Sequence, residues 1–156
     1  MKPLQILNQM SLEEYKRKYP EIPYPSTKKF KQSSANEITK AVIKFLKLSG
    51  WQAERINTMG RVIDQRQTYT DVLGHLKQIG TMKYIPSTST RGSSDISATI
   101  RGRSIKIEVK AGRDVQSLAQ KEYQKAIERA GGIYIICHSF DEFYQWYQEF
   151  IKNEST

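Results

Sequence analysis

The sequence predicts an α/β (α+β) domain with a mixed central sheet, and two patterns carry this prediction. Apolar residues recur at helical spacing in 34–50, 116–130 and 140–150, whereas they alternate with polar residues in 95–100 and 104–110. The expected order is helix, three strands, helix, strand and a final helix. With 156 residues, 38% of them hydrophobic, the chain is long enough for one such domain.

Residues 1–33 are expected to form a basic N-terminal arm ahead of a domain spanning 34–156. Basic residues cluster at 16–18 and 28–31, with three prolines between the clusters. The stretch 11–14, Ser-Leu-Glu-Glu, could cap a short helix before the prolines. The two clusters fit either a solvated, partly disordered tail or an arm that contacts phosphates.

The first helix of the domain begins at Ser34, because Ser34-Ala35-Asn36-Glu37 has the Ser-x-x-Glu form of a capping box. Gly50 ends it, and 51–56 is a short strand. Residues 57–93 show no clear periodicity and are interpreted as an insertion or flap. Within it, 71–78 could be a short helix and 87–94 is a Ser/Thr/Gly loop.

The two alternating strands, 95–100 and 104–110, are expected to form a hairpin around Arg101-Gly102-Arg103. A turn at Arg101-Gly102 places Asp95 directly opposite Glu108. A turn at Gly102-Arg103 places Asp95 opposite Lys110 and diagonal to Glu108. In both registers the two carboxylates share one face, with Cβ atoms about 4.5–8 Å apart.

The later elements follow from caps and apolar runs. Ser117-Leu118-Ala119-Gln120 opens the helix at 116–130, and Gly131-Gly132 ends it. The run 133–137 is typical of a strand buried on both faces, in which Cys137 would be inert. Ser139 caps a last helix whose aromatic residues belong to the core. The order of elements is therefore αβββαβ followed by a helix.

Two facing carboxylates repel each other, so the hairpin gains nothing from them unless they hold a cation. Mg²⁺ prefers oxygen ligands and is commonly bound by one or two carboxylates together with water and phosphate oxygens. Such an ion would neutralise phosphate charge and lower the pKa of a bound water. Lys110, on the same face, could stabilise a developing oxyanion. The alternative is an ordinary strand with a solvated Lys-x-Glu-x-Lys face.

The overall composition fits a polyanionic partner. The formal net charge is +9, which suits nucleic acid first and an anionic membrane surface second. One cysteine excludes an internal disulfide framework and a cysteine-based zinc site. No segment is long and apolar enough to cross a membrane, and no signal-type stretch begins the chain, so a cytoplasmic location is expected.

The stretch from Ser34 to Phe143 resembles the virus-type replication-repair nuclease (VRR-NUC) domain, a branch of the PD-(D/E)XK nuclease superfamily. The resemblance is carried by Gly92-Ser93-Ser94-Asp95, Ile107-Glu108-Val109-Lys110-Ala111, the Ser117–Gln120 helix start, and Gly131-Gly132-Ile133-Tyr134. Asn36-Glu37 and Arg55-Ile56-Asn57 also fit. One departure is Ser94, where the family usually has proline. Residues 1–33 and 57–90 are not well covered.

The resemblance implies a restriction-endonuclease-like core and an Mg²⁺- or Mn²⁺-dependent endonuclease acting on branched or duplex DNA in replication, repair or recombination. Asp95 and Glu108 would bind the metal with the Val109 carbonyl, and Lys110 would be the catalytic lysine. Glu37 and Gln120 would be further catalytic residues, although each also sits where it would simply close a helix. The family includes homodimers, so a homodimer remains open. A small single-domain version is similar to those carried by phages and prophages, so the resemblance implies the cytoplasm of a bacterial cell or a phage-infected host as the expected location.

Phosphate contacts are expected from arginines on loops and turns around the site: Arg55, Arg91, Arg101, Arg103 and Arg113. Two other hypotheses stay open. One is a non-catalytic nucleic-acid-binding module on the same fold. The other is a different PD-(D/E)XK enzyme, such as a Holliday-junction resolvase or a restriction-type nuclease.

Overall fold

The computed structural model describes residues 1–57, 60–87 and 89–154 and divides into two compact units. One unit comprises residues 1–56 and 91–156, and the other comprises residues 57–90. The described part of the first unit holds four helices and a mixed four-stranded sheet, so the α+β class is confirmed. None of the described helices is long and apolar enough to cross a membrane.

The sheet has the order β1-β6-β7-β8, formed by Gln52–Arg55, Ile96–Ile100, Arg103–Val109 and Ile133–Cys137. β6 runs antiparallel to β1 and β7, whereas β7 and β8 are parallel. Ile96 pairs with Ile107, which selects the hairpin register with its turn at Arg101-Gly102. Both turn residues have positive φ (50° and 76°), as a two-residue type I′ turn requires.

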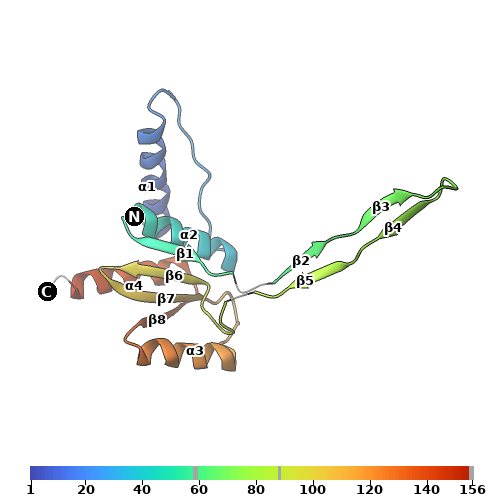
Figure 1. The fold of residues 1–156 in the computed structure, drawn as a ribbon. Coiled ribbons are helices and arrows are strands. Elements are labelled where there is room, and N and C mark those ends of the chain that lie inside the picture. The colour runs from blue at the N-terminus through green and yellow to red at the C-terminus, as the bar shows by residue number, and fades with distance from the viewer. Residues whose placement is uncertain (58–59, 88, 155–156) are drawn as a thin grey trace. The chain divides into compact units, whose positions relative to one another are not determined.

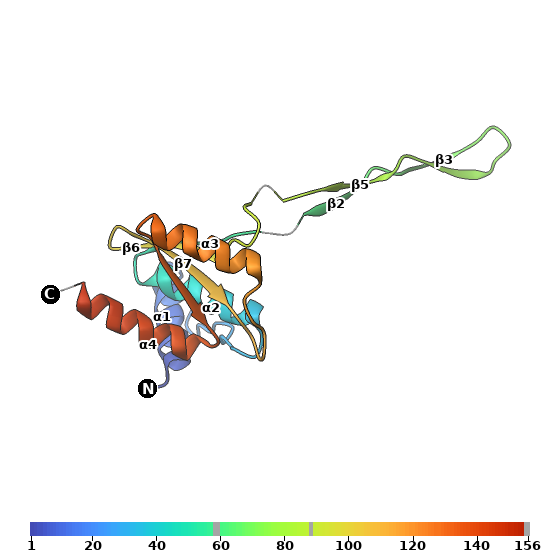
Figure 2. The same cartoon turned by 90° about the horizontal axis from the view of Figure 1, so that it is seen from below.

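Helices lie on both faces of this sheet (Figures 1 and 2). One face is covered by α2 (Ala35–Leu48) and α4 (Phe140–Asn153), on which α1 (Pro3–Lys18) packs in turn, and the other face is covered by α3 (Leu118–Arg129). The odd-numbered residues of β7, such as Ile105 and Ile107, are fully buried in the core with α2 and α4. The even-numbered residues Lys106 and Glu108 therefore face α3.

The N-terminal segment is part of the core, which corrects the expectation of a tail over its first half. The helix begins at Pro3 and not at Ser11, which lies buried inside it. Leu7 is fully buried against the core cluster, so α1 packs on α2 and α4. The expected cap was misplaced because only a few apolar residues of α1 are buried, which leaves a weak periodic signal.

Residues 57–90 contain a β-ribbon made of β2 (Arg61–Asp64), β3 (Gln67–Thr70), β4 (Leu76–Ile79) and β5 (Met82–Ile85). The expected helix at 71–78 is wrong, because the Asp71 carboxylate accepts the N–H groups of Leu73 and His75 and closes a turn. One antiparallel register runs through both strand pairs without a bulge. No described residue of the ribbon belongs to the core cluster.

The strand β8 is less buried than its apolar run suggested. Only Tyr134 and Cys137 are buried, and the other three residues are half-buried, because β8 is an edge strand of the sheet. Cys137 is a free thiol, and burial raises its pKa to about 12, as expected of an inert cysteine. Ser139 caps α4 through the Glu142 N–H, as the sequence predicted.

Candidate metal-binding active site

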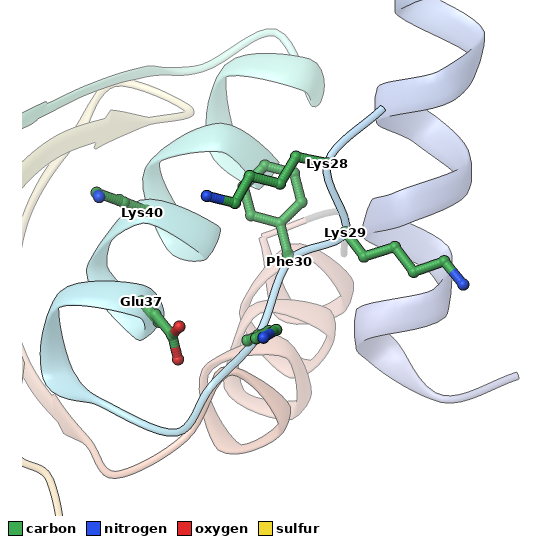
Figure 3. Close-up of a pocket in the computed structure, with 6 residues that line it drawn as sticks. Lys28, Lys29, Phe30, Glu37 and Lys40 are labelled. Atoms are coloured by element: carbon green, nitrogen blue, oxygen red, sulfur yellow. The ribbon is translucent and has the colours of Figure 1, made fainter. Parts of the chain in front are cut away.

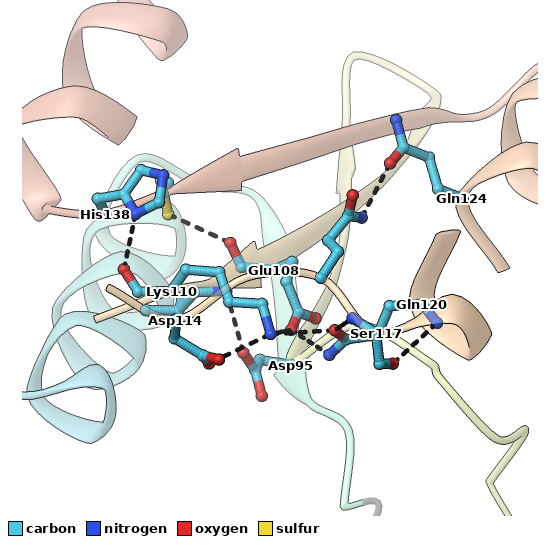
Figure 4. A network of polar contacts seen from close by, with 11 residues as sticks. Asp95, Glu108, Lys110, Asp114, Ser117, Gln120, Gln124 and His138 are labelled. Atoms are coloured by element: carbon cyan, nitrogen blue, oxygen red, sulfur yellow. Dashed lines mark hydrogen bonds and ion pairs between the residues drawn. The ribbon is translucent and has the colours of Figure 1, made fainter. Parts of the chain in front are cut away.

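Asp95 and Glu108 meet where β6 begins and β7 ends (Figure 4). Ile96 lies opposite Ile107, so the next pair outward in the same register is Asp95 and Glu108. The Val109 N–H donates to Asp95 Oδ2 at 3.0 Å, which fixes the direction of that carboxylate. The Asp95 carbonyl accepts the N–H of Ile56 at 2.8 Å and thereby ties the site to the end of β1.

Glu108 is 3% exposed and has one satisfied and one unsatisfied oxygen. Its Oε1 accepts from Gln120 Nε2 at 2.5 Å and from Lys110 Nζ at 3.1 Å. Its Oε2 is buried and has no hydrogen-bond partner among the described residues. Burial raises the pKa of Glu108, and the negative charge of Asp95 raises it further, against the opposing effect of Lys110. A buried carboxylate with a free oxygen is costly unless a ligand satisfies it.

Lys110 is 5% exposed and is surrounded by acceptors. Its Nζ donates to Gln120 Oε1 at 3.0 Å and lies 3.3 Å from Asp114 Oδ2, in addition to Glu108. Burial lowers the pKa of Lys110, but the contacts with Glu108 and Asp114 outweigh burial and raise it overall. Lys110 is therefore a protonated cation held within the site.

Asp114 is a residue of this cluster that the sequence reasoning missed. It lies on the irregular segment between β7 and α3, where no periodicity places a side chain. The available signal was simple: Asp114 is the single acid between Lys110 and Ser117.

Gln120 closes the start of α3, as one of its two expected roles requires, and its side chain also contacts the charged residues of the cluster. Its Oε1 accepts the Ser117 N–H at 2.9 Å, and Ser117 Oγ accepts the Gln120 N–H at 3.3 Å, which completes the capping box of α3. The same amide bridges Glu108 and Lys110. The cap of α3 thus fixes the positions of the two charged side chains.

The loop that leads to Asp95 lies directly against the start of α3. Gly92 has φ +79°, and a Cβ atom there would lie 2.4 Å from the carbonyl carbon and oxygen of Ala119. Glycine is therefore required by both the backbone conformation and the close approach. This contact places Asp95 and Gln120 in the same site.

Glu37 was expected at the site but does not contact the cluster around Glu108. Its carboxylate accepts the N–H and O–H of Ser33, at 3.0 and 2.5 Å, and it lines a separate pocket. Within the described residues it makes no hydrogen bond or ion pair with Asp95, Glu108 or Lys110. Ser34 does cap α2 by accepting the Glu37 N–H, and the main hydrogen bonds of the Glu37 carboxylate are those with Ser33.

The expected arginines fall into two groups. Arg55 donates to Asn36 Oδ1 beside the site, and Arg91 and Arg113 are exposed on the segments that flank Asp95 and Lys110. The expectation that Arg101 and Arg103 surround the site is wrong. They contact Glu154 at the far end of the hairpin, about 16 Å along β7 from Glu108 at roughly 3.3 Å per residue.

Two further side chains border the site. His138 Nδ1 lies 3.0 Å from the Lys110 carbonyl, so the end of β8 also positions the lysine backbone. The Tyr134 hydroxyl is buried without a partner in the described structure, and burial, followed by the charge of Glu108, raises its pKa to about 12. Tyr134 therefore stays neutral.

The carboxylate pair fits a hard divalent cation. Glu108 Oε2 has no hydrogen-bond partner in the part of the chain that the structure covers, Asp95 lies beside it, and Mg²⁺ commonly needs only one or two protein carboxylates. The arrangement does not fit a metal that needs three or more side-chain ligands in a closed site. In the part of the chain that the structure describes, no three His, Cys, Asp or Glu side chains are grouped to hold an ion.

Comparisons with known proteins add no assignment: no protein-family model and no curated protein sequence matches the chain. The resemblance to VRR-NUC domains therefore rests on the motif residues of Ser34–Phe143.

Proposed function

We propose that this chain is an Mg²⁺- or Mn²⁺-dependent endonuclease of the PD-(D/E)XK type, similar to VRR-NUC domains, that hydrolyses phosphodiester bonds in branched or duplex DNA. The observation that carries the proposal is the buried, unpartnered Glu108 Oε2 beside Asp95. A protein that only needed a stable hairpin would gain nothing from this pair of acids.

Each residue of the site would have a separate role in cleavage. Asp95, Glu108 and the Val109 carbonyl would hold the metal, which when bound neutralises phosphate charge and favours ionisation of water. Lys110 is held protonated, so it would stabilise negative charge on the phosphate during cleavage and would not act as a general base. Gln120 would keep Glu108 and Lys110 in position by bonding both.

Cleavage of labelled DNA tests the proposal. Duplex, flap, fork, four-way-junction and single-stranded substrates are incubated with Mg²⁺ or Mn²⁺ and the parent, Asp95→Ala and Lys110→Ala proteins. Removal of a metal ligand or of an electrostatic stabiliser is expected to reduce the cleavage rate by about 10²-fold or more. Glu149→Gln, an exposed acid on α4, is the matched control and should cut like the parent. Equal cleavage by all four proteins would refute the assignment.

The non-catalytic module keeps some support from the structure, because Lys110 already neutralises part of the Glu108 charge. Titration calorimetry with Mn²⁺ separates the two functions. Binding by the parent and not by Asp95→Ala supports the nuclease, whereas an absence of binding at millimolar Mn²⁺ favours the module. Cleavage confined to one base sequence would point to the restriction type, and cleavage confined to four-way junctions to the resolvase type.

A further inference from the structure

A second feature of the first unit is a basic hollow beside the N-terminal end of α2 (Figure 3). We call the extended segment Lys28–Lys31 the lysine strap. The strap and α2 enclose a hollow of about 310 Å³, lined by Lys28, Lys29, Phe30, Lys31, Glu37 and Lys40. Lys28 reaches across Phe30 toward α2, whereas Lys29 extends away from that helix.

The strap is anchored to the body of the unit. The Phe30 N–H donates to Asn8 Oδ1 of α1 at 2.8 Å, and the Phe30 ring packs against the core. Gln32, the next residue after the strap, donates to Asp141 Oδ2 at 3.2 Å and accepts the Phe140 N–H at 2.9 Å. The backbone is therefore fixed before any ligand arrives, which lowers the entropy cost of binding.

The charge of the hollow is positive and largely uncompensated. Lys28, Lys29, Lys31 and Lys40 are exposed, and none of them forms an ion pair with another described residue. The single acid in the hollow, Glu37, already accepts two hydrogen bonds from Ser33. Ammonium groups displayed in this way suit the phosphates of a nucleic-acid backbone.

The hollow lies beside the first turns of α2, and this end of the helix is linked by hydrogen bonds to the candidate active site. Asn36, in the first turn of α2, accepts a hydrogen bond from Arg55 at 2.7 Å. The next residue, Ile56, donates its N–H to the carbonyl of Asp95. Two hydrogen bonds thus join the helix end beside the strap to the strand that carries the proposed metal ligand.

We propose that the lysine strap, together with Lys40, binds the phosphate backbone of DNA next to the bond that the site cleaves. The proposal rests on the proposed nuclease function for its substrate. The charged groups that the strap presents are lysine ammonium groups, which contact phosphates and carry no information about base sequence. Binding at the strap is therefore expected to be independent of base sequence.

Fluorescence anisotropy with labelled duplexes in EDTA tests this site without any cleavage. The test variant is Lys28→Gln/Lys31→Gln/Lys40→Gln. The control is Lys16→Gln/Arg17→Gln/Lys18→Gln at the end of α1, which lowers the net charge from +9 by the same three charges. Affinity is measured over a range of KCl concentrations, on two duplexes of unrelated sequence, for both variants and the parent.

Each phosphate contact contributes about 0.9 to the slope of log K against log salt concentration, so the loss of three contacts should reduce the magnitude of this slope by about 2.7. Binding near 0.1 M salt should become about 10²-fold weaker. The test variant should lose the same factor in affinity for both duplexes, and the control variant should retain most of the parent's affinity. If the test variant binds as the parent does, or loses no more than the control, the strap is not a binding site. If its affinity falls as expected although the parent cuts no DNA, the strap stands and the nuclease function fails.

Discussion

Replacement of Gly92 by alanine is the sharpest test of how the candidate site is assembled. An alanine at φ +79° costs about 1–2 kcal/mol from the backbone conformation alone. Its Cβ would also lie 2.4 Å from the Ala119 carbonyl carbon, where carbon atoms normally approach to about 3.5 Å. The loop or the start of α3 must therefore move by about 1 Å, and such overpacking costs a further 1–3 kcal/mol or so.

Gly102 provides the matched control. Its φ is +76°, but no atom of the described residues lies within 4 Å of the position that a Cβ would occupy. Gly102→Ala should therefore lose only the conformational part, about 1–2 kcal/mol, against about 2–5 kcal/mol for Gly92→Ala. At about 2–4 °C per kcal/mol for a chain of this size, the melting temperatures should fall by about 2–8 °C and 4–20 °C respectively.

Calorimetric melting, followed by Mn²⁺ titration and DNA cleavage, distinguishes the two variants. Gly92→Ala should also lose metal binding or cleavage by about 10²-fold, because a displacement of about 1 Å misplaces the groups around Asp95 and Gln120. Gly102→Ala should keep both activities, since its turn lies at the far end of the hairpin. If the two variants melt alike and Gly92→Ala behaves as the parent at the site, the loop does not pack on α3 as described.

Two further predictions concern charge and the ribbon. Because folding raises the Glu108 pKa, the stability that this group contributes is fully present below its unfolded value near 4.5 and is lost as pH rises through the folded value. Without metal, Glu108→Gln should therefore melt at a higher temperature than the parent, and this difference in melting temperature should be larger at pH 7.5 than at pH 4.5. Mn²⁺ should raise the melting temperature of the parent only. A difference of the same size at both pH values would contradict the prediction. Replacement of residues 58–89 by a short Gly-Ser linker should change the free energy of unfolding by no more than about 0.5 kcal/mol, measured by denaturant melts, because no described residue of that segment belongs to the core. A large loss would show that the ribbon supports the first unit.

The sequence predicted the elements whose periodicity is strong. The apolar alternation in β6 and β7 predicted which face of each strand is buried. The starts of three helices were predicted from their capping residues Ser34, Ser117 and Ser139. The meeting of Asp95 and Glu108 followed from the same alternation, because strand parity fixes which side chains share a face. The sequence could not decide between the two turn registers, because both place the apolar residues of the two strands on the same face.

Other features could not be predicted because long-range packing decides them. Glu37 and Gln120 had the same sequence context at a helix start, yet Gln120 bonds Glu108 whereas Glu37 bonds Ser33. Asp114 reaches the site from an irregular segment without periodicity. The ribbon was missed because its two faces mix polar and apolar residues, so neither helical spacing nor strand alternation stands out in 57–90.

The ribbon has a consequence for how the molecule opens. Eight of the twelve exposed large hydrophobic residues in the described chain lie on it: Val62, Tyr69, Val72, Leu73, Leu76, Ile79, Met82 and Tyr84. Two strands without a third layer have no interior in which to bury such side chains, and an isolated ribbon is marginally stable in water. Its amide protons should therefore exchange through local opening long before those of β6 and β7, without unfolding of the first unit.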